Sequence, residues 1–202
     1  MPSPYLHYTV SSPIQKPRLT HTPTPVTSAS MLASPVRFSN YNFDDKPTAD
    51  EEVLDLGPLK ELLGIGELGP GGYQASIAYG QSKTANTLFA LHLNTLLVSK
   101  GIFAFAVHPG LVSSTGGSKL FDNFDDEQKK KLAAFGIMKT IDQGSATTIV
   151  AALDPVLKPE AGVYLADCQI ADAKAPVYAT RKDLAERLWK LSEELVGETV
   201  KV

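Results

Sequence analysis

Six consecutive apolar residues, Ile102–Val107, are the feature that most restricts how this chain can fold. A run of this length without polar alternation indicates a strand buried on both faces, as is typical of parallel sheets. It follows a stretch of good helix formers, Tyr79–Lys100, and Gly101 lies between the two as a helix stop. We therefore expect an α/β fold in which helices cover both faces of a parallel sheet.

The rest of the chain contains further elements of the same kind. The spacing of apolar residues predicts helices over 125–135 and 139–153 and a short strand over 162–165. A final helix has four leucines on one face: Leu184, Leu188, Leu191 and Leu195. Thr180 and Asp183 are spaced as a capping box at its start.

The N-terminal segment has a different composition. Seven of the 14 prolines lie between Pro2 and Pro35, and the first acidic residue is Asp44. Such a segment cannot sustain a helix. We expect a disordered Pro/Ser/Thr-rich tail over residues 1–25 and a folded domain over residues 26–202. A linker is favoured over an organelle transit peptide, which needs an amphipathic helix.

Charge and cysteine content narrow the function classes. The 202 residues have a formal net charge of -3 and a pI near 5.8, which does not favour nucleic acid or an anionic membrane as partner. The single cysteine, Cys168, excludes an internal disulfide and is expected to be buried among apolar residues. The sequence lacks a run of roughly 18 apolar residues, so no membrane span is predicted. We expect a cytoplasmic protein.

The segment Gly64–Gly69 matches the G-x-G-x-x-G pattern of dinucleotide-binding turns. That pattern works when a buried strand leads into the first glycine and a helix begins at the last. Here the residues before it are helical in character, and Pro70-Gly71-Gly72 follows it. A surface loop is the favoured interpretation.

Tyr79 and Lys83 are four residues apart, so they project from nearly the same face of the predicted helix. A tyrosine titrates near about 10 and becomes useful in acid-base chemistry when a neighbouring cation stabilises its phenolate. The pair therefore indicates a proton relay, whereas the alternative is an ordinary exposed helix start.

Three motifs carry a resemblance to a known family. They are Tyr79-Gly-Gln-Ser-Lys83-Thr-Ala-Asn86, His108-Pro-Gly-Leu-Val112 and Gly162-Val-Tyr-Leu-Ala-Asp-Cys168. From Val26 to the C-terminus the chain resembles the short-chain dehydrogenases/reductases, in the branch that contains retinol-dehydrogenase-like and WW-domain-oxidoreductase-like enzymes. The resemblance implies that Tyr79 is the catalytic acid or base, and that Lys83 lowers the pKa of the tyrosine and binds the ribose of a nicotinamide cofactor.

The same resemblance implies roles for residues at strand ends. Pro109 and Gly110 would border the cofactor, and Val112 and Ser114 would contact its carboxamide. Ser28, in Val26-Thr27-Ser28, would hydrogen-bond the substrate oxygen as the third catalytic residue. An unstructured tail is its alternative, because two prolines precede it.

Three other side chains near these motifs are expected to be structural. His108, beside the site, is interpreted as a satisfied structural histidine, His92 as a packing or surface residue, and Trp189 as a core or interface residue. The histidines do not have other ligands at metal spacing, so no metal site is predicted.

Family members begin with a strand, a glycine-rich turn and a helix, and the sequence before Val26 lacks this pattern. We therefore expect an α/β fold that forms the C-terminal half of a Rossmann-type doubly wound parallel sheet with flanking helices. The expected function is an oxidoreductase that uses NADP (or NAD) and interconverts a lipophilic alcohol and its carbonyl compound, with independent activity open because of the truncation. A noncatalytic interaction protein is the alternative, and either would form a homodimer through Tyr79–Lys100.

Overall fold

The computed structural model describes residues 26–30, 33–44, 73, 75–113, 125–127, 130, 138–158 and 162–201. These residues form a four-stranded sheet in the order β1-β2-β3-β4. Its strands are β1 (Val26–Ser28), β2 (Phe105–His108), β3 (Tyr164–Ala166) and β4 (Gln169–Ile170). The first three strands are parallel, and β4 pairs with β3 in the antiparallel direction.

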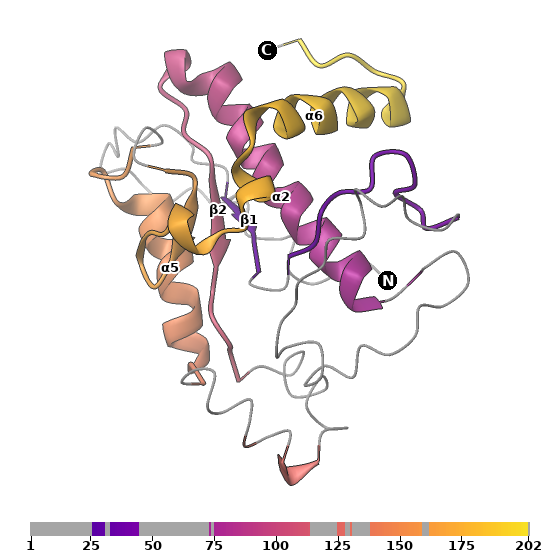
Figure 1. Cartoon of the computed structure of the whole chain (residues 1–202). Coiled ribbons are helices and arrows are strands. Elements are labelled where there is room, and N and C mark those ends of the chain that lie inside the picture. Colours follow the sequence, from indigo (N-terminus) through magenta and orange to yellow (C-terminus); the bar gives the residue numbers. More distant parts are fainter. Residues whose placement is uncertain are drawn as a thin grey trace.

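Among the described residues, α2 (Ala75–Leu97) and α5 (Ile141–Leu153) pack against this sheet, and α6 (Lys182–Val196) packs against α2. Figure 1 shows α2 and α5 on opposite sides of the sheet, with α6 crossing α2. Short 3-10 turns follow α2 (η4, Val98–Lys100) and precede α6 (η6, Asp172–Lys174, and η7, Val177–Thr180). The layered α/β architecture expected from the sequence is thus confirmed.

The alternating sides of the stretch 104–107 explain why it is apolar throughout. Ala104 and Ala106 belong to the core cluster that includes Ala90 of α2, whereas Phe105 and Val107 belong to the cluster that includes Ala151 of α5. The prediction of a strand buried on both faces is confirmed. The alanines on one side let α2 approach the sheet closely, because they add little bulk.

The helix that carries the Tyr–Lys pair begins four residues earlier than predicted and ends in η4. Gly101 follows in the left-handed conformation, with φ of 73°, and its N–H donates to the carbonyl of Val98. Glycine adopts this conformation without the steric cost that a Cβ brings, so the predicted helix stop is confirmed.

Val26–Ser28 is a strand despite the preceding prolines. It pairs with β2 in the register Ser28 beside Val107, and the N–H of Ala29 donates to the carbonyl of Val107. The strand begins directly after Pro25, so the paired residues themselves contain no proline. Residues 1–25 lie outside the described residues, and the predicted tail stays a prediction.

The capping box predicted at the start of α6 is wrong. Thr180 ends η7, and its hydroxyl donates to the carbonyl of Val177 rather than accepting from the helix. The N-cap is Arg181, which has no side-chain capping bond and instead forms an ion pair with Asp183. The final helix otherwise follows the prediction, except that Leu195 is exposed.

A capping box that the prediction missed lies at the start of α5. The hydroxyl of Thr140 accepts from the N–H of Gln143, and the side chain of Gln143 accepts from the N–H of Thr140. The Thr-x-x-Gln spacing is the usual sequence signal for this arrangement. The helix predicted over 125–135 lies mostly outside the described residues; Asp126, Glu127 and Lys130 are helical.

None of the helices among the described residues is both long and apolar enough to cross a bilayer. The same residues contain no cluster of three or more His, Cys, Asp or Glu side chains suited to hold a metal ion.

Candidate functional site

The carboxyl ends of β1, β2 and β3 meet at one edge of the sheet, because the three strands are parallel. Ser28 ends β1, Pro109 follows β2, and Asp167 follows β3. In open α/β sheets ligands bind outside this edge. Sequence motifs that are far apart along the chain therefore meet at one edge of the sheet.

Lys83 lies between the other two predicted catalytic residues. Its Nζ donates a hydrogen bond to Oγ of Ser28 at 3.2 Å and lies 5.3 Å from the ring centroid of Tyr79. Tyr79 is 47% exposed and Ser28 is also exposed, so both residues are accessible from solvent. Lys83 is half-buried, and this desolvation lowers the pKa of its ammonium from 10.5.

Asn86 joins α2 to the end of β1. The side-chain Nδ2 of Asn86 donates to the backbone carbonyl of Ser28 at 2.7 Å. The backbone carbonyl of Asn86 accepts from Oγ1 of Thr27 at 3.1 Å. The two bonds hold Ser28 opposite Lys83, which lies about one turn before Asn86 on the same helix. Asn86 is the last residue of the Tyr79–Asn86 motif, and its sequence position alone did not predict this role.

Gln81 attaches a second segment to the same helix. Its Oε1 accepts from the N–H of Arg37 and its Nε2 donates to the carbonyl of Tyr41, each at 3.0 Å. Ser34, which is buried, donates to the carbonyl of Ile77 at 2.8 Å. The stretch 34–41 is thereby fixed beside the Tyr–Lys pair, a relationship that no local sequence signal predicts.

The segment after β2 leads away from the sheet with Gly110 at φ of 86°, a value that favours glycine. Val112 forms an isolated parallel bridge with Lys139. Pro109 and Gly110 directly follow β2, at its carboxyl end. The cofactor contacts that the resemblance implies for Pro109, Gly110 and Val112 stay predictions. Ser114 lies outside the described residues, and its role stays a prediction.

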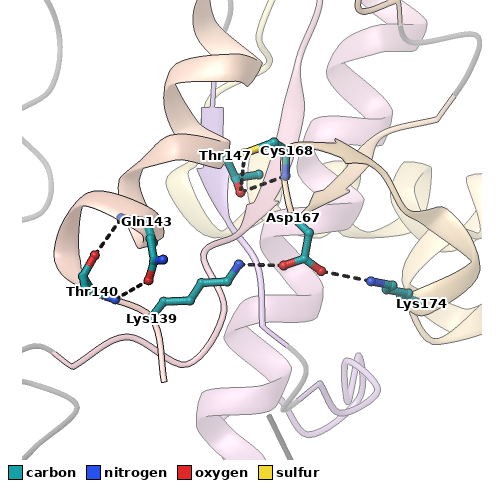
Figure 2. A network of polar contacts seen from close by, with 7 residues as sticks. All are labelled: Lys139, Thr140, Gln143, Thr147, Asp167, Cys168 and Lys174. Atoms are coloured by element: carbon teal, nitrogen blue, oxygen red, sulfur yellow. Dashed lines mark hydrogen bonds and ion pairs between the residues drawn. The ribbon is translucent and has the colours of Figure 1, made fainter. Parts of the chain in front are cut away.

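Polar contacts link the start of α5 to the end of β3, as Figure 2 shows. Asp167 accepts from Nζ of Lys139 at 2.6 Å and from Nζ of Lys174 at 3.0 Å. The hydrogen bonds from the two ammonium groups lower the pKa of Asp167 from 3.8 to about 2. The predicted burial of Cys168 is wrong: it is exposed in the tight turn after β3, and its N–H donates to Oγ1 of Thr147.

The two histidines and the tryptophan have packing roles. The ring of His108 lies 6.4 Å from that of Tyr164, and its buried Nδ1 has no hydrogen-bond partner among the described residues. Burial lowers the pKa of His108, and the nearby Lys139 adds to this effect. His92 contacts Trp189 with the ring centroids 4.9 Å apart, which confirms packing for both. We predicted that the polar atoms of His108 have hydrogen-bond partners, and this prediction is wrong for Nδ1.

The glycine-rich segment 64–69 lies outside the described residues, so its interpretation as a surface loop stays a prediction.

The fold and the edge just described define a Rossmann-type α/β protein with a Tyr–Lys pair on the helix beside its first described strand. A solved structure of an uncharacterized protein from Mycobacterium paratuberculosis matches this fold with a TM-score of 0.50 at 20% identity, covering 89% of this chain and 52% of that one. At this identity the match supports the fold alone.

Sequence comparison supplies the family. Retinol dehydrogenase 12 from mouse is 34% identical over 165 residues, covering 75% of this chain and 48% of the relative. A chloroplastic short-chain dehydrogenase, TIC 32 A from Brassica napus, is 38% identical over 130 residues, covering 63% and 39%. Human polyprenol dehydrogenase is 34% identical over 127 residues, covering 62% and 37%. No protein-family model matches the sequence.

The chain belongs to the short-chain dehydrogenase/reductase family, among its retinol-dehydrogenase-like members. It spans about half the length of the first of these relatives, or less.

Proposed function

We propose that this protein is an oxidoreductase that uses NADP(H) or NAD(H) and interconverts a lipophilic alcohol with its carbonyl compound. One observation carries the proposal: the ammonium of Lys83 lies between the hydroxyl of Ser28 and the ring of Tyr79 at the carboxyl edge of a parallel sheet. A hydroxyl donor, a phenol and a cation are the groups that carbonyl reduction needs from a protein, because charge develops on the oxygen.

Each of the three side chains has a distinct part in this proposal. Tyr79 gives its phenolic proton to the carbonyl oxygen of the substrate, and in the reverse direction it accepts that proton. Lys83 stabilises the phenolate that results, since a nearby cation favours the charged form of a phenol. Ser28 donates a hydrogen bond to the same substrate oxygen and so orients it for proton transfer.

The described residues fit the nicotinamide side of a dinucleotide. Lys83 offers an ammonium that ribose hydroxyls can accept from, and it is half-buried at the edge where α/β sheets bind ligands. Pro109, Gly110, Val112 and Ser114 would line the nicotinamide. When bound, the cofactor supplies or accepts the hydride. NADP is preferred over NAD by analogy with the family branch.

The substrate class comes from the relatives. Their names specify retinol and polyprenol, both long apolar alcohols. We therefore propose a lipophilic alcohol, aldehyde or ketone as the substrate. An assay with NADPH and retinal, followed by absorbance of the reduced cofactor, tests this directly.

The decisive variant is Tyr79→Phe, which removes only the phenolic oxygen. Loss of a general acid-base group lowers turnover by about 10²- to 10⁴-fold. Tyr73→Phe is the matched control, because Tyr73 is similarly exposed, at 51% against 47%. The proposal requires that Tyr79→Phe lose turnover and that Tyr73→Phe keep it. Equal turnover of wild type and Tyr79→Phe would remove the relay from the mechanism.

A noncatalytic interaction protein is the second candidate, and it retains the same fold. NADPH titration by calorimetry with a parallel thermal melt separates the two, because a bound ligand stabilises the folded state in proportion to its occupancy. A cooperative melt without binding would favour the noncatalytic protein.

The predicted homodimer through the Tyr79–Lys100 helix is tested by sedimentation, and the predicted cytoplasmic location is tested by a fluorescent fusion.

A further inference from the structure

We infer that Lys139 and Gly144 are positioning residues that set the conformation of the segment Pro109–Val112, and that Asp167 holds Lys139 in place. The inference rests on the proposed function, in which this segment lines the nicotinamide. Neither residue is in the motifs that carry the family resemblance. Together they explain how the end of β2 is held where a cofactor would meet it.

The backbone of Lys139 holds the segment from outside the sheet. Its N–H donates to the carbonyl of Leu111 at 2.7 Å, and its carbonyl accepts from the N–H of Ser113 at 2.9 Å. These two bonds enclose Val112, so the chain cannot move there without breaking both. The segment is therefore pinned although it has left β2.

The side chain of Lys139 then crosses Gly110. A Cβ placed on Gly110 would lie 2.7 Å from Cδ, 2.8 Å from Cε and 2.9 Å from Nζ of Lys139. Contacts this short mean that the lysine stem occupies the space a larger residue would need. The ammonium continues to Asp167, where it is bound at 2.6 Å (Figure 2).

The position of Asp167 is itself fixed by a tight turn between β3 and β4. Asp167 and Cys168 have φ of 53° and 62°, the two successive positive values of a type I′ hairpin turn. Cys168 is tied to α5 because its N–H donates to Oγ1 of the fully buried Thr147 at 3.2 Å. The carboxylate is thus presented to Lys139 by a constrained backbone.

Gly144 of α5 contacts the same segment at a second point, the side chain of Val112. A Cβ on this residue of α5 would lie 2.5 Å from Cγ2 of Val112 and 3.1 Å from its Cγ1. Only glycine lets Val112 approach the helix so closely. Gly144 has an ordinary helical conformation, so its value lies in the space it leaves rather than in backbone freedom.

The first experiment follows the methyl NMR signals of Val112 in the cofactor-free protein. Lys139→Met keeps most of the stem and removes the ammonium, and we expect the Val112 signals to shift. Lys174→Met is the matched control, because Lys174 also binds Asp167, whereas the three atoms nearest to a Cβ on Gly110 all belong to Lys139. Its Val112 signals should stay in place. Unchanged signals in Lys139→Met would overturn the part assigned to Lys139.

Gly144→Ala separates positioning from folding. Alanine is favoured over glycine in a helix interior by about 1 kcal/mol, so the variant has no intrinsic loss of helix stability. We expect the Val112 signals to shift in this variant. If the wild type binds NADPH, we also expect the variant to bind it about tenfold more weakly, which corresponds to about 1.4 kcal/mol. Unmoved Val112 signals in this variant would overturn the part assigned to Gly144.

A binding comparison distinguishes this inference from the proposed function. NADPH and 2′,5′-ADP share the adenosine end, but only NADPH reaches the segment 109–112. We expect Lys139→Met to weaken NADPH and leave 2′,5′-ADP unchanged, with Lys139→Arg restoring NADPH affinity. Equal NADPH affinity of wild type and Lys139→Met would overturn the cofactor role. If the wild type binds no NADPH while Val112 still moves in the variants, the proposed function fails and the positioning of the segment stands.

Discussion

The ammonium of Lys83 donates a hydrogen bond of 3.2 Å to the hydroxyl of Ser28, which joins residues 55 positions apart. The contact links the long helix α2 to the end of strand β1. Asn86, three residues further along α2, holds the carbonyl of the same serine at 2.7 Å. The helix therefore determines both where Ser28 lies and which group its hydroxyl faces.

Ser28→Ala should lower the pKa of Lys83 further. Burial already lowers this pKa from 10.5, and the serine oxygen opposes that effect by accepting from the charged ammonium. NMR titration of lysines labelled with ¹³C at Cε measures the change, with Lys83→Arg to assign the signal. Ser82→Ala is the control, because Ser82 is bonded to the carbonyl of Tyr79 instead. A Lys83 pKa that does not fall would show that the Ser28 contact is absent in solution.

Asn94→Leu should destabilise the fold strongly. The buried amide of Asn94 donates to the carbonyl of Ala104 at 2.8 Å and accepts from its N–H at 2.7 Å. Leucine leaves both backbone groups buried and unpaired, which costs about 2–4 kcal/mol in the free energy of unfolding. Urea denaturation measures this loss. Thr95→Ala, an exposed neighbour on the same helix, should change the midpoint little, and a similar effect of both variants would contradict the assignment.

Thr84→Val should leave stability unchanged or raise it by about 1 kcal/mol. Thr84 is 1% exposed, and its hydroxyl has no hydrogen-bond partner among the described residues. Valine has nearly the same shape and removes the unpaired oxygen. Thr87→Val is the matched comparison, because the buried Thr87 donates to the carbonyl of Lys83 at 3.3 Å. Thermal melts should rank Thr84→Val above Thr87→Val, and the reverse order would refute the prediction.

Asp167→Asn should remove a component of acid denaturation. The pKa of Asp167 is depressed in the folded protein, from 3.8 to about 2, by hydrogen bonds from Lys139 and Lys174. A depressed carboxyl pKa stabilises the fold above pH 3.8, and this stabilisation is lost as the pH falls towards 2.

Half of the Asp167 side chain is exposed, so solvent screening limits the effect to on the order of 1 kcal/mol or less. Unfolding followed from pH 5 to pH 2 should show a shallower loss of stability in Asp167→Asn than in the wild type. Asp44→Asn, at an exposed position, is the control. Superimposable profiles of wild type and Asp167→Asn would show that the two lysines do not stabilise the carboxylate.

Local patterns were most informative where one element could be recognised by itself. The apolar run before His108 predicted a doubly buried strand, and Gly101 predicted the end of the preceding helix, because periodicity and glycine placement report on nearby backbone. The same reasoning failed at Thr180. There a short 3-10 turn precedes the helix and engages the threonine first.

The candidate site likewise contains some residues that local patterns predict and others that they do not. Tyr79 and Lys83 could be paired from their spacing, since residues four apart share a helix face. Ser28 could not be assigned from its surroundings, because its strand is only three residues long and gains its partners from β2. Lys139 and Gly144 gave no signal, since their effect depends on Gly110 and Val112 across the fold.

The α/β class, the Tyr–Lys pair and the membership of a family could be predicted from the sequence, because they depend on residue order and short-range spacing. The contacts of Lys83 with Ser28, of Asn94 with Ala104 and of Asp167 with Lys139 are known only from the packed domain. Each of these contacts depends on the packing of separate elements around a common core, and hydrogen-bond geometry tolerates errors of only a few tenths of an ångström. No local pattern specifies positions across a sheet to that accuracy, so such contacts arise only when the whole domain packs.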